Sequence, residues 1–142
     1  VQSLKAAREL VSKGRALIVY PEGSLTRDPD LWPMRGKSGA VRLALELNIP
    51  VVPVASWGIQ NVMGRYSSKI SVFPRHDVHV KVGDAVDLSE YAGKPLDAKL
   101  LAKATAKVMD AITELLEDLR GEKAPEQRWD PTKHNQSETG KF

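Results

Sequence analysis

A short apolar run that stops abruptly in a polar, glycine-containing sequence most constrains the fold of this chain. Residues 16–20 are apolar, and Pro21, Glu22, Gly23 and Ser24 follow them directly. Brief apolar runs between glycine and proline are typical of buried strands, so we predict a strand over 16–20. Glycine then lets the backbone turn sharply, and ligands in open α/β sheets bind beyond the carboxyl ends of strands. The loop after this strand is therefore where a site is expected.

A helix and a second apolar run follow that loop. Ser38 can cap a helix that runs to about Leu47, where Asn48-Ile49-Pro50 ends it. Residues 51–56 are apolar and largely β-branched, which predicts a second buried strand. A helix between two short apolar strands suggests a βαβ unit. The pattern therefore predicts an α/β fold with a mixed sheet flanked by helices.

The remaining elements are a surface helix at the N-terminus, two weaker strands and a long helix. Apolar residues at helical spacing predict a helix before Gly14 and another over about 97–119. Weaker strands are predicted over 69–73 and 77–82. In the second of these, valines alternate with His79 and Lys81, so the valine side is expected to face the core. Residues 1–120 thus form one predicted domain, and the polar residues 121–142 a flexible tail.

Composition narrows the class of protein further. The chain has 142 residues, which suffices for one domain with a modest core. It contains no cysteine, so disulfides and thiolate metal sites are excluded. A formal charge of +3 permits an anionic partner or a membrane surface, and no nucleic-acid partner is predicted. The chain begins with Val1 and enters a helical pattern at once, so we expect it to be a piece of a longer protein.

Four blocks, in order, resemble the glycerolipid acyltransferases. Residues 20–24 (Tyr-Pro-Glu-Gly-Ser) resemble the family's Phe-Pro-Glu-Gly-Thr block. Residues 35–40 resemble its basic-Gly-Ala helix start, 49–54 its Val-Pro-Val-Val-Pro-Val strand block, and 80–86 its later Gly-Glu-Pro-Ile strand exit. The resemblance covers roughly residues 1–120 and is nearest to the 1-acyl-sn-glycerol-3-phosphate acyltransferases. It implies a glycerolipid-acyltransferase-like core that is incomplete at its N-terminus.

Two departures from the family pattern affect the expected chemistry. The family places an arginine directly after Gly-Thr, whereas Leu25 stands there and Arg27 is the nearest guanidinium. The family's catalytic His-x4-Asp block lies upstream of the Pro-Glu-Gly block, and no histidine precedes Val19. In such enzymes histidine takes the proton of the attacking hydroxyl while a carboxylate orients the imidazole. We therefore assign no catalytic residue to this chain and expect it to be inactive alone.

The resemblance does imply residues that bind the acceptor. The acceptor carries a phosphate, which Arg and Lys bind through charge-assisted hydrogen bonds. The candidates lie in the loop and at the following helix start, where backbone N–H groups also bind anions; they are Glu22, Gly23, Ser24, Arg27, Arg35 and Lys37. The alternative is a solvated charged loop with Glu22 in a local ion pair.

Three other sequence patterns do not meet the requirements of a catalytic, phosphate-binding or metal site. His79 and Asp84 have the His-x4-Asp spacing, but they follow the Pro-Glu-Gly block on an alternating strand. Gly36-Lys37-Ser38 resembles the end of a P-loop, yet Leu31 stands where that motif requires glycine. His134 lies in the polar tail without a ligand cluster. We predict no metal site and no bound cofactor.

The loop tip around Trp32 has two open interpretations. Leu31-Trp32-Pro33-Met34 is apolar and stands beside the basic residues Arg35 and Lys37, a combination that suits a lipid headgroup interface. Alternatively, Trp32 packs onto the domain.

Together these observations predict part of an acyltransferase of phospholipid biosynthesis. By the resemblance, the parent protein moves an acyl chain from acyl-CoA or acyl carrier protein to lysophosphatidic acid and forms phosphatidic acid. Peripheral contact with the cytoplasmic face of a membrane is expected. Two alternatives stay open: transfer to another lipid or glycolipid acceptor, and a non-catalytic lipid- or phosphate-binding domain on the same core.

Overall fold

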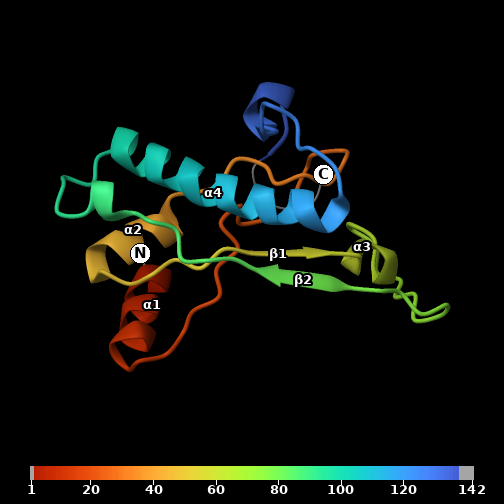
Figure 1. The fold of residues 1–142 in the computed structure, drawn as a ribbon, viewed down its shortest axis with the longest axis horizontal. Helices are drawn as coiled ribbons and strands as arrows, with labels where there is room; N and C mark the ends of the chain where they lie inside the picture. The colour runs from red at the N-terminus through yellow and green to blue at the C-terminus, as the bar shows by residue number, and fades with distance from the viewer. Residues whose placement is uncertain (1, 138–142) are drawn as a thin grey trace.

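The computed structural model, which describes residues 2–137, has a long helix packed against one face of a small antiparallel sheet (Figure 1). Strands β1 (Val54–Trp57) and β2 (His79–Val82) form the sheet, with Val54 opposite Val82 and Trp57 opposite His79. The helical elements, in chain order, are α1 (Gln2–Ser12), α2 (Gly39–Leu47), α3 (Ile59–Val62), η1 (Ser89–Tyr91), α4 (Ala98–Arg120) and η2 (Pro131–His134). A mixed α/β class is thereby confirmed.

Helix α4 contributes buried side chains to both hydrophobic clusters of the described residues. Asp97 caps its first turn by accepting a hydrogen bond from the N–H of Leu100 at 2.7 Å, and Gly121 ends it in the left-handed conformation. Its buried stripe packs against Val41 of α2 in one cluster and against Trp32 and Ala55 in a second. The predicted helix over 97–119 is confirmed. In the described part of the chain, no helix combines the length and apolarity needed to cross a membrane.

The predicted strand over 16–20 is wrong, and so is the βαβ unit built on it. These residues have no regular secondary structure, and the side chains of Ile18 and Tyr20 are 84% and 82% exposed. A strand forms only where a second strand offers backbone partners, and no strand of residues 2–137 lies beside this run. The weaker strand predicted over 69–73 is likewise absent from the sheet.

The orientation expected for the strand over 77–82 is also wrong. Ala55 is buried opposite Lys81, whose ammonium donates to the Asp118 carboxylate of α4 at 2.5 Å. This side of the sheet therefore faces α4. Val80 and Val82 point to the other side and are 63% and 64% exposed. The alternation is present as predicted, but the helix covers the opposite face.

Trp32 packs onto the domain, which confirms the second interpretation of the loop tip. Trp32 is 5% exposed and Met34 is 2% exposed. The Arg120 guanidinium lies between two indole rings, 3.9 Å from the Trp32 centroid and 4.3 Å from that of Trp57. It also donates to the Asp30 carbonyl at 2.8 Å. This loop tip therefore presents no exposed tryptophan to a headgroup interface.

Residues 121–137, called the C-terminal strap below, fold back against the body of the protein. The N–H of Arg35 donates to the Trp129 carbonyl at 3.0 Å, and the Trp129 ring stacks on His134 at 3.7 Å. Pro131 is buried. Residues 121–137 thus lie against the body of the protein, and the flexibility expected of the tail from its composition stays a prediction. The remainder of that tail, 138–142, lies outside the described residues.

Candidate functional site

A cavity of about 680 Å³, called the cationic cavity below, lies between the Pro-Glu-Gly loop, the start of α2, α4 and the strap. Five cationic side chains and two carboxylates line it, together with an apolar floor. The charged residues are Glu22, Arg35, Lys37, Arg42, Arg128, Asp130 and Lys133, and the floor includes Met34, Leu101, Ala102, Ala106 and Met109.

Backbone contacts hold the Pro-Glu-Gly loop against the start of α2. The N–H of Lys37 donates to the Pro21 carbonyl at 2.7 Å, and the N–H of Met34 donates to Oε2 of Glu22 at 2.9 Å. Gly36 lies so close to α4 that a Cβ there would stand 2.8 Å from Sδ of the buried Met109. These contacts bring two separate sequence blocks to one wall of the cavity.

Gly23 allows the Lys37 ammonium to lie across the turn. Gly23 has φ +71°, and its N–H closes a turn by donating to the Tyr20 carbonyl at 3.0 Å. A Cβ at Gly23 would stand 3.2 Å from Nζ of Lys37, so the side chain of Lys37 occupies that space. The glycine of the motif therefore serves the close approach of a cation to the backbone turn.

Of the two carboxyls that line the cavity, Glu22 has the more strongly shifted pKa. Burial raises its pKa to about 7, and the hydrogen bond from Met34 opposes that rise. Near neutral pH the group therefore exists in both protonation states, and it can accept or donate a hydrogen bond to a hydroxyl or phosphate.

Replacing Glu22 with glutamine is expected to change how stability depends on pH. The folded-state pKa lies above the unfolded value, so the folded chain binds the extra proton more tightly. Protonation of Glu22 therefore stabilises the folded state fully below about pH 4.5, and this stabilisation is lost as the pH rises through about 7. Glu22→Gln should remove this loss and raise the free energy of unfolding at pH 8 by about 1–3 kcal/mol. Denaturant unfolding at about pH 5 and pH 8 measures the free energy of unfolding of the unsubstituted chain and of Glu22→Gln. If that free energy changed equally with pH in both, the raised pKa of Glu22 would be contradicted.

The structure brings together three of the six predicted acceptor-binding side chains. Glu22, Arg35 and Lys37 line the cavity, whereas Gly23 does not line it and lies against the Lys37 side chain. Ser24 and Arg27 do not line it. Ser24 donates to the Leu25 carbonyl at 3.3 Å, and Arg27 is 2% exposed within the loop. Arg27, the guanidinium nearest to the position of the family's arginine, is therefore buried in this structure and does not line the cavity.

Sequence reasoning missed the cavity residues that α2 and the strap supply. Arg42 follows Ser38 by one helical turn, a spacing that places both on one helix face. Arg128, Asp130 and Lys133 belong to the polar tail, where no periodic pattern indicated packing. Hydrogen bonds from Thr132 hold the pKa of Asp130 below its usual range, so this carboxylate is charged at neutral pH.

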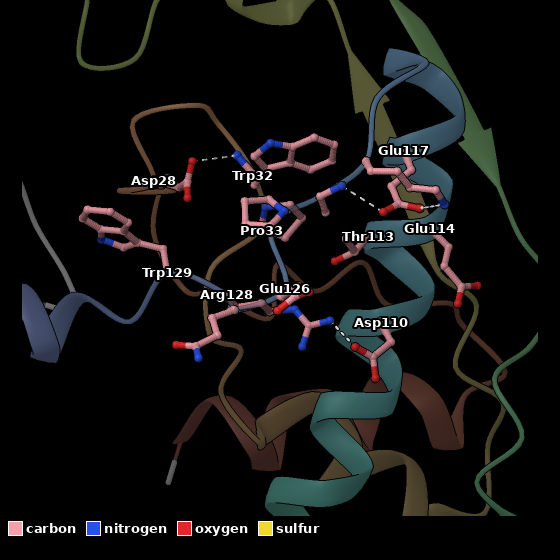
Figure 2. Close-up of a pocket in the computed structure, with 14 residues that line it drawn as sticks. Asp28, Trp32, Pro33, Asp110, Thr113, Glu114, Glu117, Glu126, Arg128 and Trp129 are labelled. Carbon is pink, nitrogen blue, oxygen red and sulfur yellow. Dashed lines mark hydrogen bonds and ion pairs between the residues drawn. The ribbon is translucent and has the colours of Figure 1, made fainter.

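A second cavity, of about 550 Å³, lies between residues 28–33, α4 and residues 123–129 of the strap (Figure 2). Carboxylates dominate its lining: Asp28, Asp110, Glu114, Glu117 and Glu126, against the cations Lys123 and Arg128. Figure 2 shows Arg128 directed at Asp110, with which it forms an ion pair. An acidic lining disfavours a phosphate, so the cationic cavity is the better candidate site. Among residues 2–137, no group of His, Asp and Glu is arranged to hold a metal ion.

Comparisons with known proteins agree with the blocks seen in the sequence. Residues 1–57 match the family model described as Acyltransferase. A chloroplastic 1-acyl-sn-glycerol-3-phosphate acyltransferase of Brassica napus is 38% identical over 63 residues, 44% of this chain and 18% of the relative. That of Limnanthes douglasii is 42% identical over 59 residues, 41% of this chain and 20% of the relative. That of Saccharomyces cerevisiae is 29% identical over 120 residues, 84% of this chain and 37% of the relative.

The chain spans only part of these relatives, since the matched regions cover between 18% and 37% of their lengths. No solved structure matches the chain significantly. The resemblance stated from the sequence blocks is confirmed.

Proposed function

We propose that this chain, whose residues 1–57 match the Acyltransferase family, is the acceptor-binding part of an enzyme that acylates lysophosphatidic acid. The product is phosphatidic acid, and the donor is acyl-CoA or acyl carrier protein. Relatives named 1-acyl-sn-glycerol-3-phosphate acyltransferase support this acceptor. The observation that carries the proposal is a cavity in which the family's Glu22-Gly23 turn meets Lys37, Arg35 and an apolar floor.

The lining of the cavity suits a lysophospholipid in two respects. Cations bind the phosphate through charge-assisted hydrogen bonds, which are about twice as strong as neutral ones. Met34, Leu101 and Met109 offer apolar surface to the first carbons of an acyl chain. Glu22, held by the Met34 N–H, is placed to accept a hydrogen bond from the glycerol part. The described residues thus supply binding and orientation.

The chemical step requires a base from the upstream His-x4-Asp block of the parent protein. The acceptor hydroxyl attacks the thioester carbonyl, a C–O bond forms, the C–S bond breaks, and the thiol leaves with a proton. The residues of the cationic cavity hold the hydroxyl in place for that attack, and such positioning lowers the barrier substantially. Because acceptor and product are membrane lipids, we propose that the enzyme works at the cytoplasmic face of a membrane.

Replacing Lys37 with alanine in the full-length enzyme tests the acceptor assignment. We expect kcat/KM for lysophosphatidic acid to fall roughly tenfold or more, because a charge-assisted hydrogen bond is removed, while the donor KM changes little. Lys103→Ala, which removes an exposed lysine of α4 outside the cavity, is the matched control. The buried Arg27 gives the contrast: Arg27→Ala should lower the melting temperature and leave acceptor KM unchanged.

Three outcomes would redirect the proposal. A rise in acceptor KM with Arg27→Ala and none with Lys37→Ala would place the phosphate at Arg27. Equal use of lysolipids with and without a phosphate monoester would favour another lipid or glycolipid acceptor. A full-length protein that binds lysophosphatidic acid but lacks the His-x4-Asp block would be a non-catalytic binding protein.

A further inference from the structure

The C-terminal strap forms one wall of the cationic cavity, although no block of the family resemblance includes it. Its residues Arg128, Asp130, Pro131 and Lys133 all line the cavity. The strap is fixed there by the hydrogen bond from Arg35 to the Trp129 carbonyl and by the short helix η2. A polar segment that is anchored against a binding cavity can contribute to ligand recognition as well as to packing.

Asp130 and Lys133 present opposite charges to the same space. Oδ2 of Asp130 lies 3.7 Å from Nη1 of Arg35. The strap therefore forms an ion pair with one of the cations that precede α2. Lys133 lies one turn further along the strap and is exposed. Within residues 2–137, Lys133, Lys37 and Arg42 form no ion pair that meets ordinary distance limits. An incoming phosphate thus meets three such cations, a fourth (Arg35) that pairs with Asp130, and a fifth (Arg128) that pairs with Asp110.

We propose that the strap belongs to the phosphate site: Lys133 binds the phosphate of a lysophospholipid, and Asp130 competes with that phosphate for Arg35. The proposal rests on the proposed function for the identity of the ligand. The ligand is a phosphate monoester with an attached apolar chain, and it binds between α2, α4 and the strap. Lys133 raises the affinity, and Asp130 lowers it by pairing with Arg35.

The two residues can be tested with substitutions of opposite expected sign. Asp130 caps η2, and its Oδ1 accepts from the N–H and hydroxyl of Thr132 at 3.0 and 2.7 Å. Asparagine keeps an oxygen at that position and is a good N-cap residue, so Asp130→Asn removes the charge with the cap retained. Lys133→Gln removes the ammonium of an exposed side chain. Neither change is expected to alter the folded state.

The experiment is a calorimetric titration of the 142-residue chain with 1-octanoyl lysophosphatidic acid below its critical micelle concentration. We expect Lys133→Gln to weaken binding roughly fivefold and Asp130→Asn to tighten it roughly threefold, because each substitution changes one charge at a partly exposed site. Lys103→Gln should leave the affinity unchanged. Octanoylglycerol, which lacks the phosphate, should bind weakly and equally to the unsubstituted chain and to each variant.

The outcomes separate this proposal from the proposed function. If the chain binds octanoyl lysophosphatidic acid and Lys37→Gln weakens binding, but Lys133→Gln and Asp130→Asn do not change it, the strap is only structural and the proposal is overturned. The proposed acceptor would then stand. If Asp130→Asn weakens binding, Asp130 supports the site rather than competing with the ligand, which also overturns it. No binding by the unsubstituted chain would overturn both.

Discussion

Gly58→Ala is expected to destabilise the chain by about 3–5 kcal/mol, through left-handed backbone strain and overpacking together. Gly58 follows β1 with φ +101°, and a Cβ there would stand 2.1 Å from the carbonyl oxygen of Asp77. That oxygen belongs to the backbone that leads into β2, so it cannot move without separating the pair Trp57 and His79.

Gly93→Ala is the matched control for this prediction. Gly93 has φ +70°, but no atom lies within 4 Å of the added Cβ, so only backbone strain remains. We expect a cost of about 1 kcal/mol there. Thermal or denaturant unfolding of the two variants measures the difference. Equal destabilisation would mean that β1 and the segment before β2 do not approach each other as closely as the structure shows.

Trp32→Ala is expected to cost about 3–5 kcal/mol of unfolding free energy, the usual penalty for removing a large buried aromatic side chain. The side chain packs with Ala55 and Leu116, and it forms one side of the aromatic pair that encloses the Arg120 guanidinium. Arg65 donates to the Thr26 and Asp28 carbonyls at 2.7 and 2.8 Å, so we expect the loop to close only partly over the space left by the indole ring.

Phe73→Ala is the control for Trp32→Ala, since the Phe73 side chain is 84% exposed. Its removal should change stability by less than about 0.5 kcal/mol. Chemical denaturation monitored by circular dichroism compares the two. If both substitutions were equally mild, Trp32 would be an exposed loop tip after all, and the headgroup-interface interpretation would return.

Local signals identified the helices well and the strands poorly. Helices α2 and α4 satisfy their backbone groups internally, so apolar spacing and the residues at their ends suffice to locate them. A strand needs the backbone hydrogen bonds of a neighbouring strand, and an apolar run such as 16–20 does not show whether that neighbour exists. The alternation in β2 identified two faces, but which face is covered depends on where α4 packs, a contact between distant residues.

The same distinction applies to the candidate site. Glu22 and Lys37 could be predicted because both stand in blocks that resemble a known family. Arg27 is a candidate only because it lies close to Gly23 in sequence, yet its side chain is buried and does not line the cavity. Asp130 and Lys133 carry no motif, and they line the cavity because a backbone hydrogen bond from Arg35 to Trp129 holds the strap against the body. Side chains brought to a site by tertiary packing leave no local pattern in the sequence.

Acceptor binding in the cationic cavity is tested most directly by an NMR titration of the 142-residue chain with 1-octanoyl lysophosphatidic acid. The expected result is a saturable shift of the backbone amides of Glu22, Lys37 and Ser38, which octanoylglycerol does not reproduce. Shifts confined to Val80 and Val82 on the uncovered face of the sheet, or identical shifts with octanoylglycerol, would show non-specific apolar binding and would contradict a phosphate site at the start of α2.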